Sequence, residues 1–259
     1  MRQKVACVTG AGARIGRSIA IALAEKGFDL IIHYNQNQQG ILTTKQRIEA
    51  LQRKAICVQA DLSQHEQCLH FIDSVQQHCE HLDVLVNNAS LFSPQKFETI
   101  THHMWQEMLQ VNVTAPFVLS QGLLPLLKQG TLHTHLSLNT EEATKWRKAC
   151  IVHLCDIGAD RPLKGYTHYA VSKAALQMLV KSMAIELAPT ISCVGISPGQ
   201  IAWPPFFDQQ ARQKVIQRIP MQREGETKDI AQLLCHLVLE APYINGAIIP
   251  VDGGLACRY

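Results

Sequence analysis

The feature that most constrains this chain is a regular alternation of short apolar runs with longer segments of helical period. Short runs rich in β-branched residues are typical of strands that are buried on both faces of a parallel sheet. Such runs occupy residues 5–8, 30–32, 55–58, 84–86, 149–154, 194–196 and 247–250. Because helical segments separate them, the sequence predicts an α/β fold, in which right-handed crossovers form a doubly wound parallel sheet of about seven strands with helices on both faces.

The chain is expected to form a single domain over residues 1–259. It has no internal repeat and no linker rich in Pro, Gly and Ser, and its hydrophobic fraction of 47% suffices for one continuous core. Two segments interrupt the alternation: residues 129–147 are polar and weakly periodic, and residues 198–222 are rich in Pro and aromatic residues. The second follows a strand end, where substrates are covered in sheets of this type, so we predict a substrate lid around 198–222.

Composition argues against several other classes of protein. The net charge of +3 is spread along the chain without a basic block, so we expect no nucleic-acid partner. No apolar run reaches the roughly 18–20 residues that span a bilayer, and no signal-peptide pattern precedes the first strand, so we expect no membrane association and a cytoplasmic location. The nine cysteines have irregular spacings and are expected to be free, and the histidines show no convincing metal-ligand spacing.

A glycine-rich turn follows the first predicted strand and leads into the first amphipathic helix. Residues 9–16 read Thr-Gly-Ala-Gly-Ala-Arg-Ile-Gly. Glycines at such a turn let the backbone approach a pyrophosphate, and the helix start favours its negative charge. We therefore predict cofactor contacts from Gly10, Gly12, Arg14, Ile15 and Gly16, although a glycine-rich run can also be no more than a tight turn.

The end of the second predicted strand bears on the choice of cofactor. His33, Tyr34 and Asn35 stand there, without the carboxylate that would bond a ribose 2′-hydroxyl. Arg14 and the amides of residues 35–37 can instead hold a 2′-phosphate, so we predict NADPH (NADP) as the cofactor.

Asp61 and Leu62 follow the third predicted strand. They are predicted to lie at the adenine ring, with a helix N-cap as the alternative role for Asp61.

Tyr169 and Lys173 are the predicted catalytic pair. Their spacing of four places the phenol and the ammonium on one face of a helix. A phenol of ordinary pKa transfers protons poorly at neutral pH, and we expect Lys173 to lower the pKa of Tyr169 by favouring the phenolate. Taken alone, this spacing occurs by chance in many helices and is better explained by a surface pair.

Together with residues 9–16, residues 87–89 (Asn-Asn-Ala) and Asn112, this pair makes the chain resemble the short-chain dehydrogenase/reductase superfamily from Lys4 to about Gly254. The resemblance implies a Rossmann-type fold. It also implies that Tyr169 is the acid, that Lys173 binds the nicotinamide ribose, and that Asn112 holds a water and a backbone kink in a proton relay. Further cofactor contacts are then expected from Asn88, Ala89, Ser90, Pro198 and Gly199.

One substitution departs from the superfamily. Where most members carry a serine on the fifth strand, this chain has Asp156, and no serine occurs between Leu138 and Tyr166. A carboxylate would repel a developing alkoxide, but it can accept N–H bonds from a nitrogen-rich substrate or, with a raised pKa, pass on a proton.

Asp156, Arg14 and Ser90 make the chain similar to the pteridine reductases. Further matching pieces are His33 and Tyr34, Pro162 and Leu163, residues 165–167, and residues 251–254. The resemblance implies that Phe92 stacks on a pterin, with Ser90, Arg14, Asp156 and Tyr169 around its edge; packing in the core is the alternative for Phe92. The predicted reaction is NADPH-dependent reduction of a dihydropterin to a tetrahydropterin.

Two other functions remain open at this stage: a carbonyl reductase of the 3-oxoacyl or ketone type, and a cofactor-binding regulator without turnover. A homo-oligomer, often a tetramer in the superfamily, is also expected. The helix that carries Tyr169 has an apolar stripe of Ala175, Leu179, Met183 and Leu187, flanked by Leu176 and Val180. A second buried face explains this pattern, and so does an ordinary buried helix.

Overall fold

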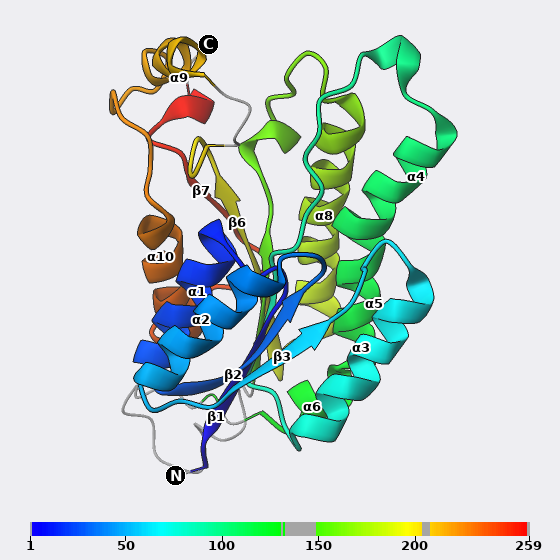
Figure 1. Ribbon diagram of the computed structural model, residues 1–259, viewed down its shortest axis with the longest axis vertical. Coiled ribbons are helices and arrows are strands. Elements are labelled where there is room, and N and C mark those ends of the chain that lie inside the picture. Colours follow the sequence, from blue (N-terminus) through cyan, green and yellow to red (C-terminus); the bar gives the residue numbers. More distant parts are fainter. Residues whose placement is uncertain (1, 131, 133–148, 204–207, 258–259) are drawn as a thin grey trace.

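A seven-stranded parallel sheet runs through the computed structural model, which describes residues 2–130, 132, 149–203 and 208–257 (Figure 1). Its strands are β1 (Lys4–Val8), β2 (Phe28–Tyr34), β3 (Ala55–Gln59), β4 (Val84–Asn87), β5 (Ala149–Leu154), β6 (Ile191–Pro198) and β7 (Ile248–Val251). They lie in the order β3-β2-β1-β4-β5-β6-β7. All seven predicted strands and the parallel, doubly wound sheet are confirmed; β2 and β6 are longer than their apolar runs.

Helices cover both faces of the sheet (Figure 1). They are α1 (Arg14–Glu25), α2 (Gln38–Ala50), α3 (His65–His78), α4 (His102–Leu109), α5 (Ala115–Gly122), α6 (Leu124–Leu127), α8 (Thr167–Glu186), α9 (Gln209–Ile216) and α10 (Thr227–Leu239), with short turns η1 (Phe97–Thr99), η2 (Gln110–Thr114), η3 (Ile157–Ala159) and η4 (Leu255–Cys257). Two apolar cores result, because α1, α2 and α10 pack on one face while α3, α5, α6 and α8 pack on the other.

The amphipathic pattern explains why α1 lies where it does. Ile19 and Leu23 are fully buried against the sheet, and Ile15 packs at the edge of the same core. Successive side chains of a strand point to opposite faces, so Cys150 and Val152 of β5 contribute to the core under α1. The alternate side chains of β5, which include Ala149 and Ile151, point to the opposite face and join the core under α8.

The strand order places a crevice between β1 and β4. The chain continues to β2 and β3 on one side of β1, and to β4 through β7 on the other. At such a switch point the loops at the carboxyl ends of the strands diverge, which leaves room for a ligand. The residues that follow β1, β4, β5 and β6 therefore face one site.

Some expectations fall partly outside the described residues. The polar segment 129–147 lies almost entirely there, as do residues 204–207 of the predicted lid. In the described part of the lid, Ile201 bridges to Gly225 and α9 follows. All nine cysteines are free, as expected. Among the described residues no helix is long and apolar enough to cross a membrane, and no His, Cys, Asp and Glu cluster could hold a metal ion.

Candidate active site

The glycine-rich turn between β1 and α1 needs glycine at two positions. Gly10 has a φ of +65°, in the left-handed region. At Gly16 a β-carbon would lie 2.3 Å from the carbonyl oxygen of Gly10 and 2.5 Å from Nδ2 of Asn88. Gly12 is less constrained, since its nearest neighbour to a β-carbon is 3.4 Å away. The turn thus brings the start of α1 close to the carboxyl end of β4.

Two side chains fix this turn: Thr9, which opens it, and Asn88, which follows β4. Thr9 Oγ1 accepts hydrogen bonds from the backbone N–H groups of Asn88 (2.9 Å) and Ala89 (3.0 Å). Asn88 Nδ2 donates to the carbonyls of Thr9 (2.8 Å) and Gly10 (3.1 Å). Asn88 and Ala89 therefore lie at the predicted cofactor end.

His33 has a different place from the predicted cofactor contact. It is buried beneath the turn, where Nδ1 accepts from the N–H of Gly10 (3.0 Å) and Nε2 lies 3.0 Å from the carbonyl oxygen of Ala60. Burial lowers the pKa of His33 to about 4, so the ring is neutral at pH 7 with its proton on Nε2. His33 supports the turn from behind; its ring does not face the crevice.

Next to the end of β2, Tyr34 is partly buried and Asn35 is exposed. Asn37 is used structurally, because its side chain caps α2 by accepting from Gly40 N–H (2.9 Å). Sequence analysis missed Arg17, whose guanidinium donates to the carbonyls of Gly12 and Gly40 and to Thr44 Oγ1. No motif signals this role, because two of the three acceptors are backbone oxygens.

Asp61 and Leu62 follow β3. Asp61 Oδ1 accepts from the N–H of Ser63 (3.0 Å), and Leu62 is buried. The alternative role of Asp61 as a helix N-cap is wrong, because α3 begins at His65 with Gln64 at the N-cap position.

Arg14 connects the glycine-rich turn to the predicted lid. Its own φ is +51°, and its guanidinium donates to the carbonyl of Ala202. Nearby, Pro198 ends β6 and the N–H of Gly199 donates to the carbonyl of Val251 (3.0 Å). The residues after β6 therefore lie across the crevice from the start of α1.

Asp156 and Tyr169 are in direct contact. Tyr169 Oη donates to Asp156 Oδ2 at 2.8 Å, and Asp156 Oδ1 accepts from Gly158 N–H at 2.6 Å. Burial raises the pKa of Asp156, against that N–H and the charge of Lys173, which lower it. Burial, and after it the charge of Asp156, raise the pKa of Tyr169 well above its ordinary value. The two groups form a buried acid pair in which the phenol donates its proton to the carboxylate.

Lys173 lies one helical turn from Tyr169 and is 3% exposed. Its Nζ donates to the carbonyl of Leu154 (2.8 Å) and stands 5.7 Å from the centroid of the Tyr169 ring. Burial lowers the pKa of Lys173. The expected lowering of the Tyr169 pKa is wrong, because burial and the charge of Asp156 raise that pKa and outweigh the opposing charge of Arg14.

Asn112 sits in η2, a π-helical turn, which is the backbone irregularity expected at this residue. Its Oδ1 accepts from Leu91 N–H (2.8 Å) and Ser90 Oγ (3.1 Å), and its Nδ2 donates to Ser172 Oγ (2.9 Å). Ser172 Oγ in turn donates to the carbonyl of Tyr169 (2.7 Å). Asn112 thus couples the loop after β4 to the catalytic helix.

Aromatic rings line the entrance beside the acid pair. Phe92 stacks on Tyr166 with centroids 4.8 Å apart and planes at 17°, and it meets Tyr169 edge to face, also at 4.8 Å. Phe92 is 37% exposed, so packing in the core does not explain it. Sequence analysis used Tyr166 only as part of a matching motif, whereas the structure places its ring in this wall.

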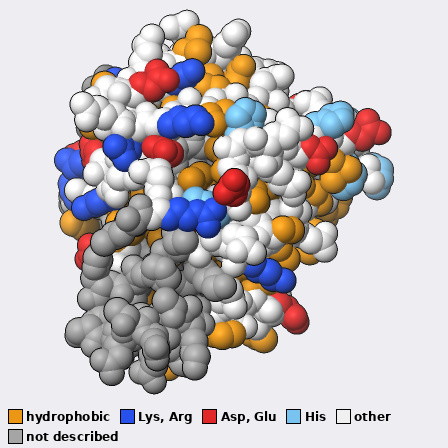
Figure 2. Space-filling model, turned by 90° about the horizontal axis from the view of Figure 1, so that it is seen from below, with side chains coloured by type: hydrophobic (Ala, Val, Ile, Leu, Met, Phe, Trp, Pro, Cys, Tyr) orange, Lys and Arg blue, Asp and Glu red, His pale blue; other side chains and the backbone are white. Residues whose placement is uncertain are grey.

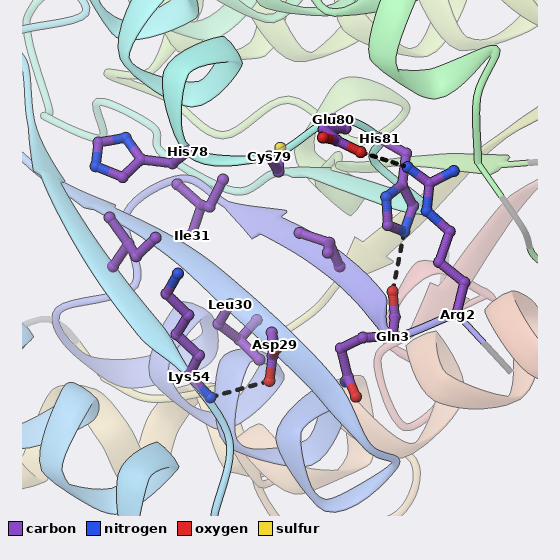
Figure 3. Close-up of a pocket in the computed structure, with 12 residues that line it drawn as sticks. Arg2, Gln3, Asp29, Leu30, Ile31, Lys54, His78, Cys79, Glu80 and His81 are labelled. Carbon is purple, nitrogen blue, oxygen red and sulfur yellow. Dashed lines mark hydrogen bonds and ion pairs between the residues drawn. The ribbon is translucent and has the colours of Figure 1, made fainter.

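A separate hollow of about 270 Å³ lies at the opposite end of the sheet (Figure 3). His81 there faces the carbonyl of Gln3 (2.9 Å) and Asp83 (3.4 Å), and Arg2 pairs with Glu80. Seen from below, charged side chains of both signs are interspersed over the described part of the surface (Figure 2). Because this is the amino end of the strands, the hollow is not where a parallel sheet binds its cofactor.

The comparisons with known proteins agree with this geometry. A family model described as enoyl-(acyl carrier protein) reductase matches residues 10–256. Among solved structures, a short-chain alcohol dehydrogenase from Sinorhizobium meliloti, itself described as putative, superimposes with a TM-score of 0.87 at 26% identity, covering 100% of this chain and 98% of that one. The NADP complex of RhlG from Pseudomonas aeruginosa gives 0.85 at 28% identity, covering 99% and 97%.

Curated relatives span several activities. Glucose 1-dehydrogenase 2 of Bacillus subtilis is 29% identical, covering 97% of this chain and 94% of its own. Dihydromonapterin reductase of Klebsiella pneumoniae is also 29% identical (97% and 96%), and pteridine reductase 1 of Leishmania tarentolae is 30% identical (96% and 95%).

The fold and the site define an oxidoreductase of the short-chain dehydrogenase/reductase superfamily. Within it, the chain belongs to the family that the matching model describes as enoyl-(acyl carrier protein) reductase.

Proposed function

We propose that this protein is a pteridine reductase, which uses NADPH to reduce a dihydropterin to a tetrahydropterin. The observation that carries the proposal is the 2.8 Å hydrogen bond from Tyr169 to Asp156. A carboxylate at this place suits a substrate whose reacting bond is C=N, because it can accept N–H bonds from a nitrogen-rich ring but would repel the alkoxide that forms from a carbonyl.

The residues present fit a dinucleotide. The close approach at Gly16, the positive φ of Gly10 and the exposed N–H groups at the start of α1 make a cradle for a pyrophosphate. Arg14 is a cation of this turn that is proposed to reach a 2′-phosphate, and its bond to Ala202 can be exchanged for one to a ligand. One N–H of the Lys173 ammonium donates to the carbonyl of Leu154. The remaining N–H groups can bond the nicotinamide ribose.

The reduced cofactor, when bound, supplies the hydride. The protein's own residues handle the proton. Asp156, whose pKa burial raises, holds or releases a proton at Oδ2, and Tyr169 Oη passes it toward the substrate nitrogen or back. Gly158 N–H fixes the other carboxylate oxygen, so the acid pair keeps one orientation.

We also propose substrate contacts from Arg14, Ser90 and Phe92. Phe92 offers a flat apolar face, and Ser90 Oγ is held by Asn112 at 3.1 Å. A planar heterocycle with N–H groups at its edge matches a site with an aromatic wall and a carboxylate.

The test is turnover of purified protein with dihydromonapterin, dihydrobiopterin and dihydrofolate, followed by loss of reduced-nicotinamide absorbance with NADPH and with NADH. Pterin turnover with a preference for NADPH supports the proposal. Good turnover of ketones or sugars without any pterin turnover overturns it. The variant Arg14→Ala is expected to weaken NADPH binding more than NADH binding, because only NADPH carries the 2′-phosphate.

Carbonyl reduction is the second candidate, since the glucose dehydrogenase relative is as similar as the dihydromonapterin reductase. The same substrate panel, extended to glucose, ketones and acyl thioesters, separates the two. A regulator that binds NADPH but oxidises it with none of these substrates is the third outcome.

We also propose a homo-oligomer that works in the cytoplasm. On α8, Leu176, Val180 and Met183 face the core, so part of the predicted apolar stripe is ordinary packing. A different stripe, seven residues apart, is exposed: Val171 (42%), Met178 (59%) and Ile185 (80%). Apolar residues at this exposure on one helix face favour pairing with a second copy, and two such contacts give a tetramer.

A further inference from the structure

A forked set of hydrogen bonds joins the glycine-rich turn to α2, which lies beside α1 (Figure 1). Its centre is Arg17, near the start of α1. Arg17 Nη2 donates to the carbonyl of Gly12, in the turn, and to that of Gly40 (3.0 Å), on α2. Arg17 Nε donates to Thr44 Oγ1 (3.0 Å), also on α2. All three acceptors are uncharged oxygens, so these bonds of Arg17 hold backbone and hydroxyl groups in place.

Thr44 extends the set to a second carbonyl of the turn. Its side chain is fully buried, and Oγ1 donates to the carbonyl of Ala11 at 3.0 Å. The carbonyl of Gly40 lies 3.1 Å from the same hydroxyl but already accepts from Arg17, so the single hydroxyl proton can go to Ala11. Packing is close here, since a β-carbon at Gly40 would lie 2.4 Å from the carbonyl oxygen of Gly12. Two successive carbonyls are therefore held from the side of α2.

These bonds fix the direction in which the N–H groups of the turn point. A trans peptide is planar, and its N–H points opposite to its C=O. Because the carbonyls of Ala11 and Gly12 point toward α2, the N–H groups of Gly12 and Ala13 point away from it. Neither N–H has a hydrogen-bond partner in the described part of the chain. Both stand just before α1, and backbone N–H groups at a helix start bind phosphate oxygens.

We propose that Arg17 and Thr44 are positioning residues for the dinucleotide: they turn two carbonyls toward α2, so that the N–H groups of the same two peptides face the pyrophosphate. The inference rests on the cofactor binding proposed above, and not on the pterin. It differs from the role proposed for Arg14, whose guanidinium is expected to reach the 2′-phosphate itself. Arg17 acts through the backbone.

The consequence concerns both nucleotides equally. Without Arg17, the peptide after Gly12 can rotate and present its carbonyl oxygen, which carries partial negative charge, to the phosphate. NADPH and NADH carry the same pyrophosphate, so affinity for both falls by the same factor. Loss of a contact to the 2′-phosphate would instead weaken NADPH alone.

The experiment measures NADPH and NADH binding to Arg17→Met through the fluorescence of the reduced nicotinamide. Methionine keeps an unbranched apolar side chain but has no donors. Arg47→Met is the matched control, since Arg47 is an exposed arginine in the last turn of α2 and its loss removes the same charge. We expect Kd for both nucleotides to rise about tenfold in Arg17→Met, the equivalent of one hydrogen bond, and less than about twofold in the control.

Turnover separates positioning of the cofactor from a general loosening of the site. In Arg17→Met, KM for the cofactor should rise. The kcat at saturating cofactor should stay within about twofold of the wild type, with whichever substrate of the panel is turned over, because none of the described bonds of Arg17 goes to Asp156 or Tyr169.

Thr44 gives an independent test in which no charge changes. Thr44→Ser keeps the hydroxyl and should bind both nucleotides as the wild type does. Thr44→Val replaces the hydroxyl by a methyl group of similar size, which releases the carbonyl of Ala11, and should weaken both nucleotides by about fivefold.

Unchanged Kd values in folded Arg17→Met overturn the inference, and so does a loss confined to NADPH or a kcat that falls with the affinity. If Arg17→Met does not fold, equal binding by Thr44→Val and Thr44→Ser overturns it. Wild-type protein that binds neither nucleotide overturns it together with the proposed cofactor. Since nucleotide binding needs no pterin, absence of pterin turnover overturns the proposed reaction alone.

Discussion

Replacing Asp156 by serine tests the central contact of the site. The change removes a hydrogen bond of 2.8 Å to Tyr169 in which one partner is a largely buried carboxylate. Hydrogen bonds to charged groups contribute roughly 1.5–3 kcal/mol, which corresponds to about 10- to 150-fold in rate. We therefore expect kcat/KM for a dihydropterin to fall by about 100-fold in Asp156→Ser. NADPH affinity should change by less than about threefold, because Asp156 touches none of the residues of the glycine-rich turn.

The pH profile gives a second readout of the same change. The charge of Asp156 raises the pKa of Tyr169, so its removal lets the phenol ionise at lower pH. The remaining activity of Asp156→Ser should then decline at a lower pH than that of the wild type. Asp160→Ser is the matched control, since the exposed Asp160 bonds Gln177 and lies outside the acid pair. Equal losses in turnover and NADPH affinity, or pterin activity equal to that of the control, would refute the reasoning.

Three further outcomes are expected. Without cofactor, Gly16→Ala should lower the Tm far more than Gly12→Ala, because a β-carbon at Gly16 lies 2.3 Å from a carbonyl oxygen; equal Tm values contradict this. The pKa of His33 is lowered to about 4 from 6.5, so the unfolded chain binds its proton first and the protein loses about 3 kcal/mol of stability as the pH falls from 6.5 to 4. His33→Gln should flatten that part of a Tm-against-pH curve, and an unchanged slope would count against the assignment. Ile185→Glu should reduce the molar mass in light scattering, whereas Tyr243→Glu, fully exposed elsewhere, should not; a mass unaffected by Ile185→Glu argues against pairing through α8.

The sheet could be predicted because its strands are buried on both faces. Burial on both faces makes a strand apolar at every position, so the runs stand out without reference to partners. The strand ends could not be placed in this way. Residues 191–193 of β6 include Ser192, whose polarity hides the strand although its side chain is buried.

The candidate site was predictable where spacing alone sets geometry, as in Tyr169 and Lys173 on one helix. It was not predictable where the face to which a strand residue points decides the contact, or where opposing effects decide the direction of a pKa shift. His33 was expected at the cofactor, yet its side chain faces Phe71 beneath the turn, 5.2 Å between ring centroids. The direction of the pKa shift of Tyr169 likewise depends on the burial of the phenol and on its contact with Asp156, which no spacing gives.

Asp156 and Tyr169 are best understood as one proton-carrying unit. Two acids in contact, both with pKa values raised by burial, do not lose both protons near neutral pH, because the second ionisation would place two negative charges 2.8 Å apart. The pair therefore keeps at least one proton that it can donate. Reduction of one C=N bond consumes one hydride and one proton, so a proton held in the pair suffices for one turnover. A serine in place of Asp156 would leave Tyr169 as the sole donor, which suffices for a carbonyl oxygen that bonds the phenol directly. A ring nitrogen that must also be held by its neighbouring N–H groups gains from the carboxylate, and on this difference we base the proposal of pterin reduction over carbonyl reduction.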